Sequence, residues 1–303
     1  MIPNKKDKMK IAVIGAGKWG KALYHAYSQN NSVVIHSRTP KPIENFVSLD
    51  KALNCKYLIM AIPAQFVRKW MEENFEDRGQ NILVAAKGIE TSTGAFLNDI
   101  YSSFIDEDRL AYISGPSFAA EVEKSLPTAL IMSSTNLNLA KKYADALPSF
   151  IKGYVDSDVV GAEVSGAYKN VIAIAGGVCD GFNLGNNARA ALISRGLVEM
   201  TRFAEAFGAK SDTFLSLGGA GDLFLTASSK LSRNYRVGLG LSKGQSIDEI
   251  LKDLGEVAEG VPTSKALFKI AQDKGLYLPI ASEVYAMIEE GKDPMKSVKD
   301  LLA

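Results

Sequence analysis

Histidine and cysteine are scarce in this chain, which holds two of each among 303 residues. The cysteines, Cys55 and Cys179, lie far apart and fit no metal-ligand spacing, so the sequence predicts reduced cytosolic thiols and no metal site. Charge of one sign is also missing, because 35 basic and 34 acidic residues leave a net charge of +1. That balance gives no reason to expect nucleic acid or an anionic membrane as a partner. No apolar run approaches the roughly 20 residues of a membrane span.

Other absences narrow the class of protein further. The chain has no Walker loop, no G-x-S-x-G elbow and no zinc-type cluster, which argues against an NTPase, a serine hydrolase and a metalloprotease. Residues 1–8 are polar and basic with no apolar run behind them, so we expect a disordered overhang and no secretory signal. The length of 303 residues predicts two domains of roughly 150 residues each.

A glycine motif follows the first apolar run of the chain. Residues 10–15 read as a strand covered on both faces, and Gly15, Gly17 and Gly20 then form G-x-G-x-x-G ahead of a helical pattern. The first glycine permits a tight turn, the second lets backbone approach a pyrophosphate, and the third lets helix pack on strand. The motif predicts dinucleotide binding at the helix N-terminus. The alternative is a glycine-rich turn that only packs.

The second predicted strand, Ser32–His36, bears on the choice of cofactor. An NAD-specific fold usually places an acidic residue after this strand, but here Arg38 stands in that region. A guanidinium suits a 2′-phosphate, so NADPH is permitted and NADH is not excluded. The alternative is a solvated surface arginine.

Further strands alternate with helices up to about residue 156. They are predicted at residues 57–61, 82–86, 110–113, 128–132 and 150–155, with a helix capped by Asn136 before the last. From Val159 onward we expect helices only, at 159–177, 187–207, 222–231, 247–254, 264–274, 281–289 and 295–302. Thr263 is the expected cap of one of them, and Pro294 the expected first turn of another. The fold class is therefore α/β: a doubly wound parallel sheet in residues 9–156, then an all-helical domain in residues 157–303.

Ligands bind beyond the carboxyl ends of the strands in such sheets. Lys87 follows one of these ends and is placed to meet an anionic substrate, whereas Ser114–Ala119 follows another and turns into a helix. In the helical half, a glycine-rich loop delivers Asp222, and Ser232–Asn234 groups a hydroxyl, a guanidinium and an amide that suit a phosphate monoester. Taken singly, each could be a solvated loop or a plain turn.

Lys169 stands out because it lies in the apolar helical stretch Val159–Gly177. Lysine is almost never fully buried without a partner, so it is either functional or snorkels to the surface. Histidine is the usual acid or base of nicotinamide chemistry, but His25 and His36 both fall on the nucleotide side. Their placement favours Lys169 in that role.

Taken together, the ordered motifs resemble the bacterial NAD(P)-dependent glycerol-3-phosphate dehydrogenases from Met9 to the end of the chain. The residues that carry this resemblance are Gly15–Gly20, Lys87-Gly88, Ser114–Ala119, Gly166–Asn170, Gly218–Leu223, Ser232–Asn234 and Glu259-Gly260. The family has a Rossmann domain and an all-helical domain. It is cytoplasmic and interconverts dihydroxyacetone phosphate and sn-glycerol 3-phosphate with NAD(P)H for phospholipid synthesis. A homodimer is compatible with the resemblance.

The resemblance also implies roles for individual residues. Lys169 would be the catalytic acid and base, protonating the alkoxide that hydride transfer creates. The implied substrate-binding residues are Lys87, Gly115, Ser117, Lys169, Asp222, Ser232, Arg233 and Asn234. The implied cofactor-binding residues are Gly15, Gly17, Lys18, Trp19, Gly20, Arg38, Lys87, Ala119, Arg233, Val257 and Glu259. One departure from the family is the segment Lys41–Asp50, which is shorter than usual and bears on the adenine and ribose contacts.

Two other functions fit parts of the pattern. A lysine-using 3-hydroxyacid or ketopantoate reductase would share both domains but act on carboxylates. A nucleotide sensor would bind NADPH without oxidising it, although it would have no need of both lysines and Asp222.

For Lys169, burial and the charge of Lys87 are expected to lower the pKa from its free value of about 10.4, whereas Asp222 would raise it.

Overall fold

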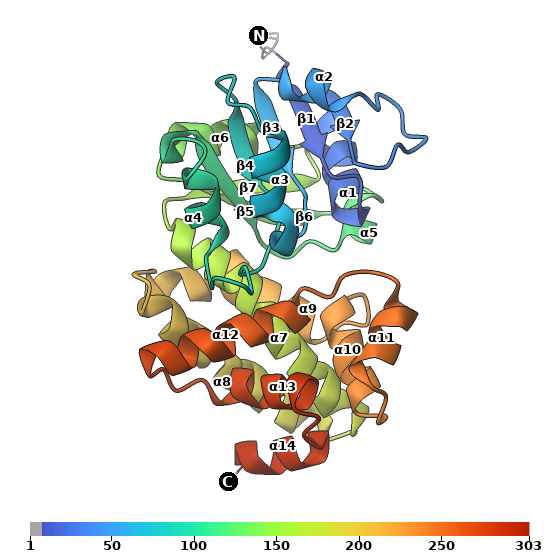
Figure 1. Cartoon of the computed structure of the whole chain (residues 1–303), viewed down its shortest axis with the longest axis vertical. Coiled ribbons are helices and arrows are strands. Elements are labelled where there is room, and N and C mark those ends of the chain that lie inside the picture. The colour runs from blue at the N-terminus through green and yellow to red at the C-terminus, as the bar shows by residue number, and fades with distance from the viewer. Residues whose placement is uncertain (1–7, 303) are drawn as a thin grey trace.

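The computed structural model describes residues 8–302, and all but the last residue of the predicted overhang lies outside them. The chain forms two stacked bodies: a sheet flanked by helices, and beyond it a domain of helices (Figure 1). The connection between them follows Asp156, where the last strand ends, and Val159 begins the first helix of the second body. The predicted division at residues 156 and 157 falls in this connection, and we retain it as a proposal.

Seven strands form a single sheet in the order β2-β1-β3-β4-β5-β6-β7. They are β1 (Lys10–Ile14), β2 (Ser32–His36), β3 (Tyr57–Met60), β4 (Asn81–Val84), β5 (Leu110–Ser114), β6 (Thr128–Ser133) and β7 (Ile151–Asp156). The sheet is mainly parallel, as predicted for a doubly wound fold, with one exception: β6 runs antiparallel to β5. The segment between them holds only the short helix α5 (Ala119–Val122), so the chain turns back beside β5 without the long crossover that a parallel neighbour needs.

Helices cover both faces of the sheet. They are α1 (Lys18–Ser28), α2 (Leu49–Leu53), α3 (Val67–Asn74), α4 (Leu97–Ser102) and α6 (Leu137–Asp145). Successive residues of β1 alternate between the two cores: Ile11 and Val13 pack on the α1 side, and Ala12 and Ile14 on the other. Both faces of this strand are therefore buried, as its continuous apolar run predicts.

The second body is organised around α7 (Val159–Gly181), most of whose residues are buried. Its neighbours are α8 (Gly185–Glu205), α9 (Asp222–Ala227), α10 (Arg233–Leu241), α12 (Gly260–Lys274) and α13 (Pro279–Glu289), while α11 (Ile247–Leu254) and α14 (Pro294–Leu302) lie further out. Close packing explains the small residues of α7. A Cβ at Gly177, for example, would come within 2.0 Å of the Tyr235 carbonyl oxygen on α10.

Some predicted helix boundaries in this domain are wrong. The helix from Asp222 ends at Ala227 and not near residue 231, and α10 was not predicted. Gly238 and Gly240 interrupt its helical pattern, but Gly238 lies where α10 crosses α7 and Gly240 faces Ile250 of α11, and neither position leaves room for a side chain. Thr263 does not cap α12, which already begins at Gly260. Pro294 does begin α14, as predicted.

Candidate active site

The site lies where the carboxyl ends of several strands face the helical domain (Figure 1). Gly15 follows β1, Lys87 follows β4 and Gly115 follows β5, so three predicted segments meet at one edge of the sheet. Helix α7 contacts β5 and carries Lys169 to the same boundary. This is the crevice in which open α/β sheets bind their ligands.

The glycine turn after β1 fits the phosphates of a dinucleotide. Gly15 has a φ of +109°, which favours glycine, and a Cβ there would come within 2.5 Å of the Ala61 carbonyl oxygen. Helix α1 begins after Gly17, which has no side chain to cap the first amides of the helix. A Cβ at Gly17 would meet no atom of the described chain within 4 Å. The first amides of α1 thus border open space, as an anion site at a helix N-terminus requires.

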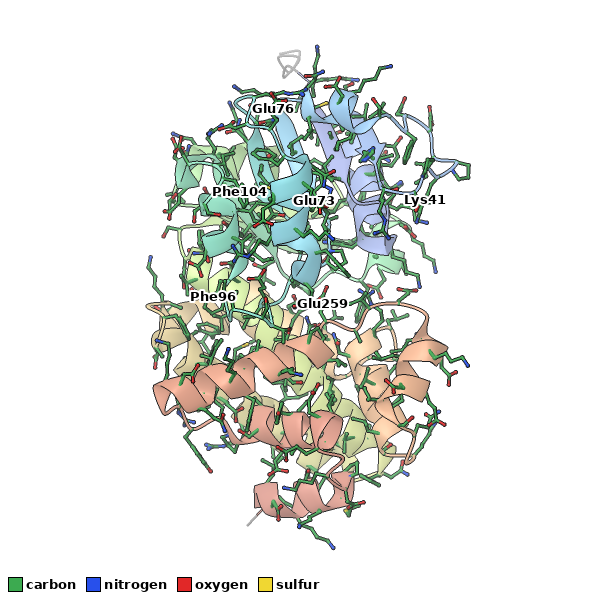
Figure 2. The ribbon with its side chains drawn as sticks, viewed as in Figure 1. Lys41, Glu73, Glu76, Phe96, Phe104 and Glu259 are labelled. Carbon is green, nitrogen blue, oxygen red and sulfur yellow. The ribbon has the colours of Figure 1, made fainter. Side chains whose placement is uncertain are left out.

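Other predicted cofactor residues surround this turn. Trp19 Nε1 donates to the Ala85 carbonyl at 3.1 Å, which fixes the indole beside β4. Lys18 pairs with Glu256 at 2.5 Å, and Arg38 is exposed beyond β2. From the short segment after β2, Lys41 reaches back and donates to the Ala16 carbonyl at 2.9 Å (Figure 2 labels Lys41). That segment therefore supports the turn directly.

Two lysines share one buried carboxylate at the centre of the crevice. Lys169 Nζ lies 2.5 Å from Asp222 Oδ1, and Lys87 Nζ lies 2.8 Å from Asp222 Oδ2. Thr226 Oγ1 accepts from Lys169 at 3.1 Å and donates to Asp222 Oδ1 at 3.1 Å. Asp222 is 1% exposed and Lys169 is 6% exposed, so the lysine of the apolar helix is buried and paired. It does not snorkel.

Burial decides the electrostatics of this cluster. Desolvation lowers the pKa of Lys169, Asp222 raises it and Lys87 lowers it, which leaves the value at about 7. Burial would raise the pKa of Asp222, but the ammonium groups of Lys169 and Lys87 outweigh it and the pKa is lowered. A lysine that titrates near neutral pH beside a permanent carboxylate can both donate and accept a proton.

Contacts around Lys87 explain its position. A Cβ at Gly166 would come within 3.2 Å of Lys87 Cγ, so the absence of a side chain lets the lysine stem lie directly on α7.

Thr226 was not predicted as part of the site. It stands four residues after Asp222 on α9, one helical turn away, and this spacing is the signal that could have identified it.

A second group of predicted residues gathers at the start of α12. Asn234 Oδ1 accepts from the Gly260 amide at 2.9 Å, and the Ser232 hydroxyl accepts from the Tyr235 amide and so caps α10. Figure 2 shows Glu259 at the boundary between the domains. Burial raises the pKa of Glu259 to about 7, and its Oε2 has no hydrogen-bond partner within residues 8–302.

The turn after β5 holds the last predicted group. Gly115 has a φ of +115°, and Ser117 Oγ donates to the Gly115 carbonyl at 3.1 Å. Ala119 begins α5, which packs on α1. Val257 and Arg233 lie on the rim, and Arg233 contacts Glu256 at 3.4 Å. Glu256 was not predicted, and no motif marks it, although it contacts cations of both domains.

The fold is that of a two-domain class of oxidoreductases with a Rossmann-type sheet for a dinucleotide, and the crevice between the domains holds the buried Lys169. Residues 28–140 match the family model described as NAD-dependent glycerol-3-phosphate dehydrogenase N-terminus, and residues 158–299 match that of the C-terminus. The chain belongs to the NAD-dependent glycerol-3-phosphate dehydrogenase family.

Individual proteins agree with this assignment. The glycerol-3-phosphate dehydrogenase [NAD(P)+] of Sulfurimonas denitrificans is 56% identical over 97% of this chain and 99% of its own. The crystal structure of glycerol-3-phosphate dehydrogenase from Coxiella burnetii is 31% identical, with a TM-score of 0.88 over 97% of this chain and 99% of that one. A 2-dehydropantoate 2-reductase from Geobacter metallireducens is 12% identical, with a TM-score of 0.56 over 94% of this chain and 100% of that one, and so shares the fold alone.

Proposed function

We propose that this protein interconverts dihydroxyacetone phosphate and sn-glycerol 3-phosphate with NAD(P)H. The observation that carries the proposal is the buried Lys169 held by Asp222, with Lys87 on the other carboxylate oxygen. Membership of the family supports the reaction, since relatives that share more than half of their residues with this chain bear its name.

The proposed chemistry of the protein is a proton transfer at Lys169 Nζ. In reduction, the ammonium donates a proton to the oxygen that becomes the hydroxyl group, and in oxidation the neutral amine accepts it. A positioned acid or base contributes roughly 10² to 10⁴ in rate. Lys87, and Lys169 while it is protonated, also supply positive charge beside the developing alkoxide.

The proposed substrate site extends along the crevice. Arg233 is the guanidinium of the Ser232–Asn234 group and suits a phosphate monoester, while Ser232 and Asn234 shape the backbone around it through their hydrogen bonds. The full proposed set is Lys87, Gly115, Ser117, Lys169, Asp222, Ser232, Arg233 and Asn234. A matched assay with dihydroxyacetone phosphate and ketopantoate tests the substrate class. We expect turnover with the phosphate ester, and preference for the carboxylate would refute it.

The residues around the glycine turn fit a nicotinamide dinucleotide, which supplies or accepts the hydride when bound. We propose that the α1 amides after Gly17 hold its pyrophosphate and that Glu259 faces its nicotinamide half. The complete proposed set is Gly15, Gly17, Lys18, Trp19, Gly20, Arg38, Lys87, Ala119, Arg233, Val257 and Glu259.

Replacing Arg38 should change the choice of cofactor. Arg38 is exposed beyond β2, so Arg38→Ala removes a charge without disturbing the core. If it binds a 2′-phosphate, KM for NADPH should rise roughly tenfold and KM for NADH should stay within twofold, because an exposed charge-assisted contact is worth about 1.5 kcal/mol. Steady-state kinetics with both cofactors measure this. Equal changes in both KM values would remove Arg38 from the 2′-phosphate site.

The cellular setting is also a proposal. No helix within residues 8–302 is long and apolar enough to cross a bilayer. We propose a cytoplasmic enzyme that supplies glycerol 3-phosphate for phospholipid synthesis. Residues 9–156 would be its dinucleotide-binding domain and residues 157–303 its helical substrate-binding and catalytic domain. Fractionation of cells that produce the full chain tests the location, and recovery with the membranes would contradict it.

We further propose a homodimer that pairs the outer edge of β7. Within the described chain, β7 is the last strand of the sheet and its outer edge faces no further strand. Tyr154 and Val155 of β7 and the nearby Leu215 are exposed apolar side chains beside this edge. Open edges pair readily, and an antiparallel pair of identical strands has the twofold symmetry of most dimers. Light scattering should give twice the chain mass for the wild type and a lower mass for Tyr154→Lys, whereas a wild-type monomer would contradict the proposal.

A further inference from the structure

A buried carboxyl of α7 crosses the domain boundary at some distance from the lysines. Glu163 is 9% exposed and its Oε1 accepts from the Asn98 amide, in the first turn of α4, at 3.0 Å. The helical domain thus holds a helix of the sheet domain through one side chain. Phe96, just before α4, packs its ring on Phe207 at 5.0 Å, and Figure 2 shows Phe96 at this boundary.

The surroundings of Glu163 oppose a negative charge. The ionisable groups that face it are Asp99 and Tyr101 of α4, Tyr112 of β5 and Lys87, and the Lys87 ammonium is bound to Asp222. No ion pair joins Glu163 to a cation of the described chain, and an ionised carboxylate here would be buried close to Asp99. An unpaired buried charge is costly, so the neutral acid is the stable form.

Unpartnered polar atoms gather around this carboxyl. Glu163 Oε2 and the hydroxyls of Tyr101 and Tyr112 make no hydrogen bond to any residue from 8 to 302. Glu163, Tyr112 and Lys87 line a cavity of about 10 Å³, about the space of one water molecule. A protonated Glu163 can donate there, directly or through such a water, while Oε1 keeps the Asn98 amide.

Glu163 lies on the same face of α7 as Lys169 and as the position that contacts Lys87. Gly166 stands one turn after Glu163 on α7 and receives the stem of Lys87, and Lys169 follows three residues later. The segment between Lys87 and Asn98 is therefore fixed to α7 at both ends. We propose that Glu163 is a positioning residue for the lysine pair: a neutral carboxyl that ties the segment after Lys87 to α7.

This proposal rests on the proposed function only for the roles of Lys87 and Lys169. The charge state of Glu163 is tested by stability alone. Burial first, and then the nearby Asp99, raise the pKa of Glu163 to about 8 against the Asn98 and Leu97 amides, which lower it. The folded protein therefore keeps a proton that the unfolded chain loses near its ordinary value of about 4.5, and stability falls as pH rises between those values.

Thermal unfolding of Glu163→Gln from pH 5 to pH 8 reads this slope. The side-chain amide of this variant keeps an acceptor for Asn98 but cannot ionise. The melting temperature of the variant minus that of the wild type should therefore increase by roughly 3 °C or more between pH 5 and pH 8. Glu123→Gln, at an exposed glutamate, is the matched control and should show no such gain. A variant that loses stability relative to the wild type as pH rises would show that Glu163 is ionised, and would overturn the proposal.

Kinetics test the positioning role. Glu163→Ala removes the tie and should lower kcat roughly ten- to a hundredfold with a smaller change in KM, because small misplacements of reacting groups are costly. Glu163→Gln should restore most of kcat at pH 7. An alanine variant that folds and keeps wild-type kcat would reduce Glu163 to a structural role. If the wild type lacks dehydrogenase activity the proposed function fails, but the pH dependence of melting still decides the charge state.

Discussion

Lys169→Met should lower kcat by roughly 10² to 10⁴ in both directions of the reaction, because it removes the proposed donor and acceptor of the proton. Methionine has a similar length and suits the apolar surroundings of α7, so the fold should persist. Initial rates with dihydroxyacetone phosphate and with sn-glycerol 3-phosphate measure the effect. Cofactor affinity should change little.

The matched control is Lys230→Met, at an exposed lysine of the same domain, which should keep wild-type rates. Circular dichroism of both variants confirms folding. If Lys169→Met keeps most of the wild-type turnover while the control behaves as expected, Lys169 is not the acid or base.

Asp222→Asn should cause the second large loss, in stability as well as rate. The carboxylate is buried and binds the ammonium groups of Lys169 and Lys87, and removing one partner of a buried ion pair typically costs about 3–5 kcal/mol. We expect the free energy of unfolding to fall by about that amount. Denaturant titration at neutral pH measures it, and kcat should fall because both lysines lose their anchor.

A double-mutant cycle separates the pair from other effects. Lys169→Met combined with Asp222→Asn should destabilise by less than the sum of the single changes, because the second change removes a charge already left without its partner. Strict additivity of the two free energies would show that the 2.5 Å contact contributes no coupling and would contradict this description of the cluster.

The sequence predicts the architecture well where one local signal decides the structure. Short apolar runs identify the strands from β1 to β6, and the glycine turn after β1 lies where its motif predicts. β7 was also predicted, at residues 150–155, although it has no such run. The direction of β6 could not be predicted in the same way, because strand direction depends on how the connection packs. Helix α10 was missed because its glycines resemble local breaks, although Gly238 allows close contact with α7 and Gly240 with α11.

Residue type and local pattern predict which residues belong to the site better than they predict which of those residues contact each other. The apolar run around Lys169 and the glycine-rich loop before Asp222 single out both residues, and the structure brings them together. Whether burial or the carboxylate determines the pKa of Lys169 depends on its exposed fraction and its distances, which only the fold supplies. Glu163 was not predicted, because nothing local marks it and its partner Asn98 on α4 lies 65 residues earlier.

The pH dependence of sn-glycerol 3-phosphate oxidation tests the central claim most directly. In the proposed mechanism oxidation needs neutral Lys169, so with a pKa of about 7 the rate constant kcat/KM should rise with pH and level off above that value, while reduction should fall over the same range. The substrate phosphate also ionises in this pH range. Inhibition by inorganic phosphate, measured at the same pH values, separates that ionisation from the ionisation of Lys169. An oxidation rate that keeps rising toward pH 10, as an ordinary lysine would give, or a flat profile, would contradict a buried lysine as the acid and base.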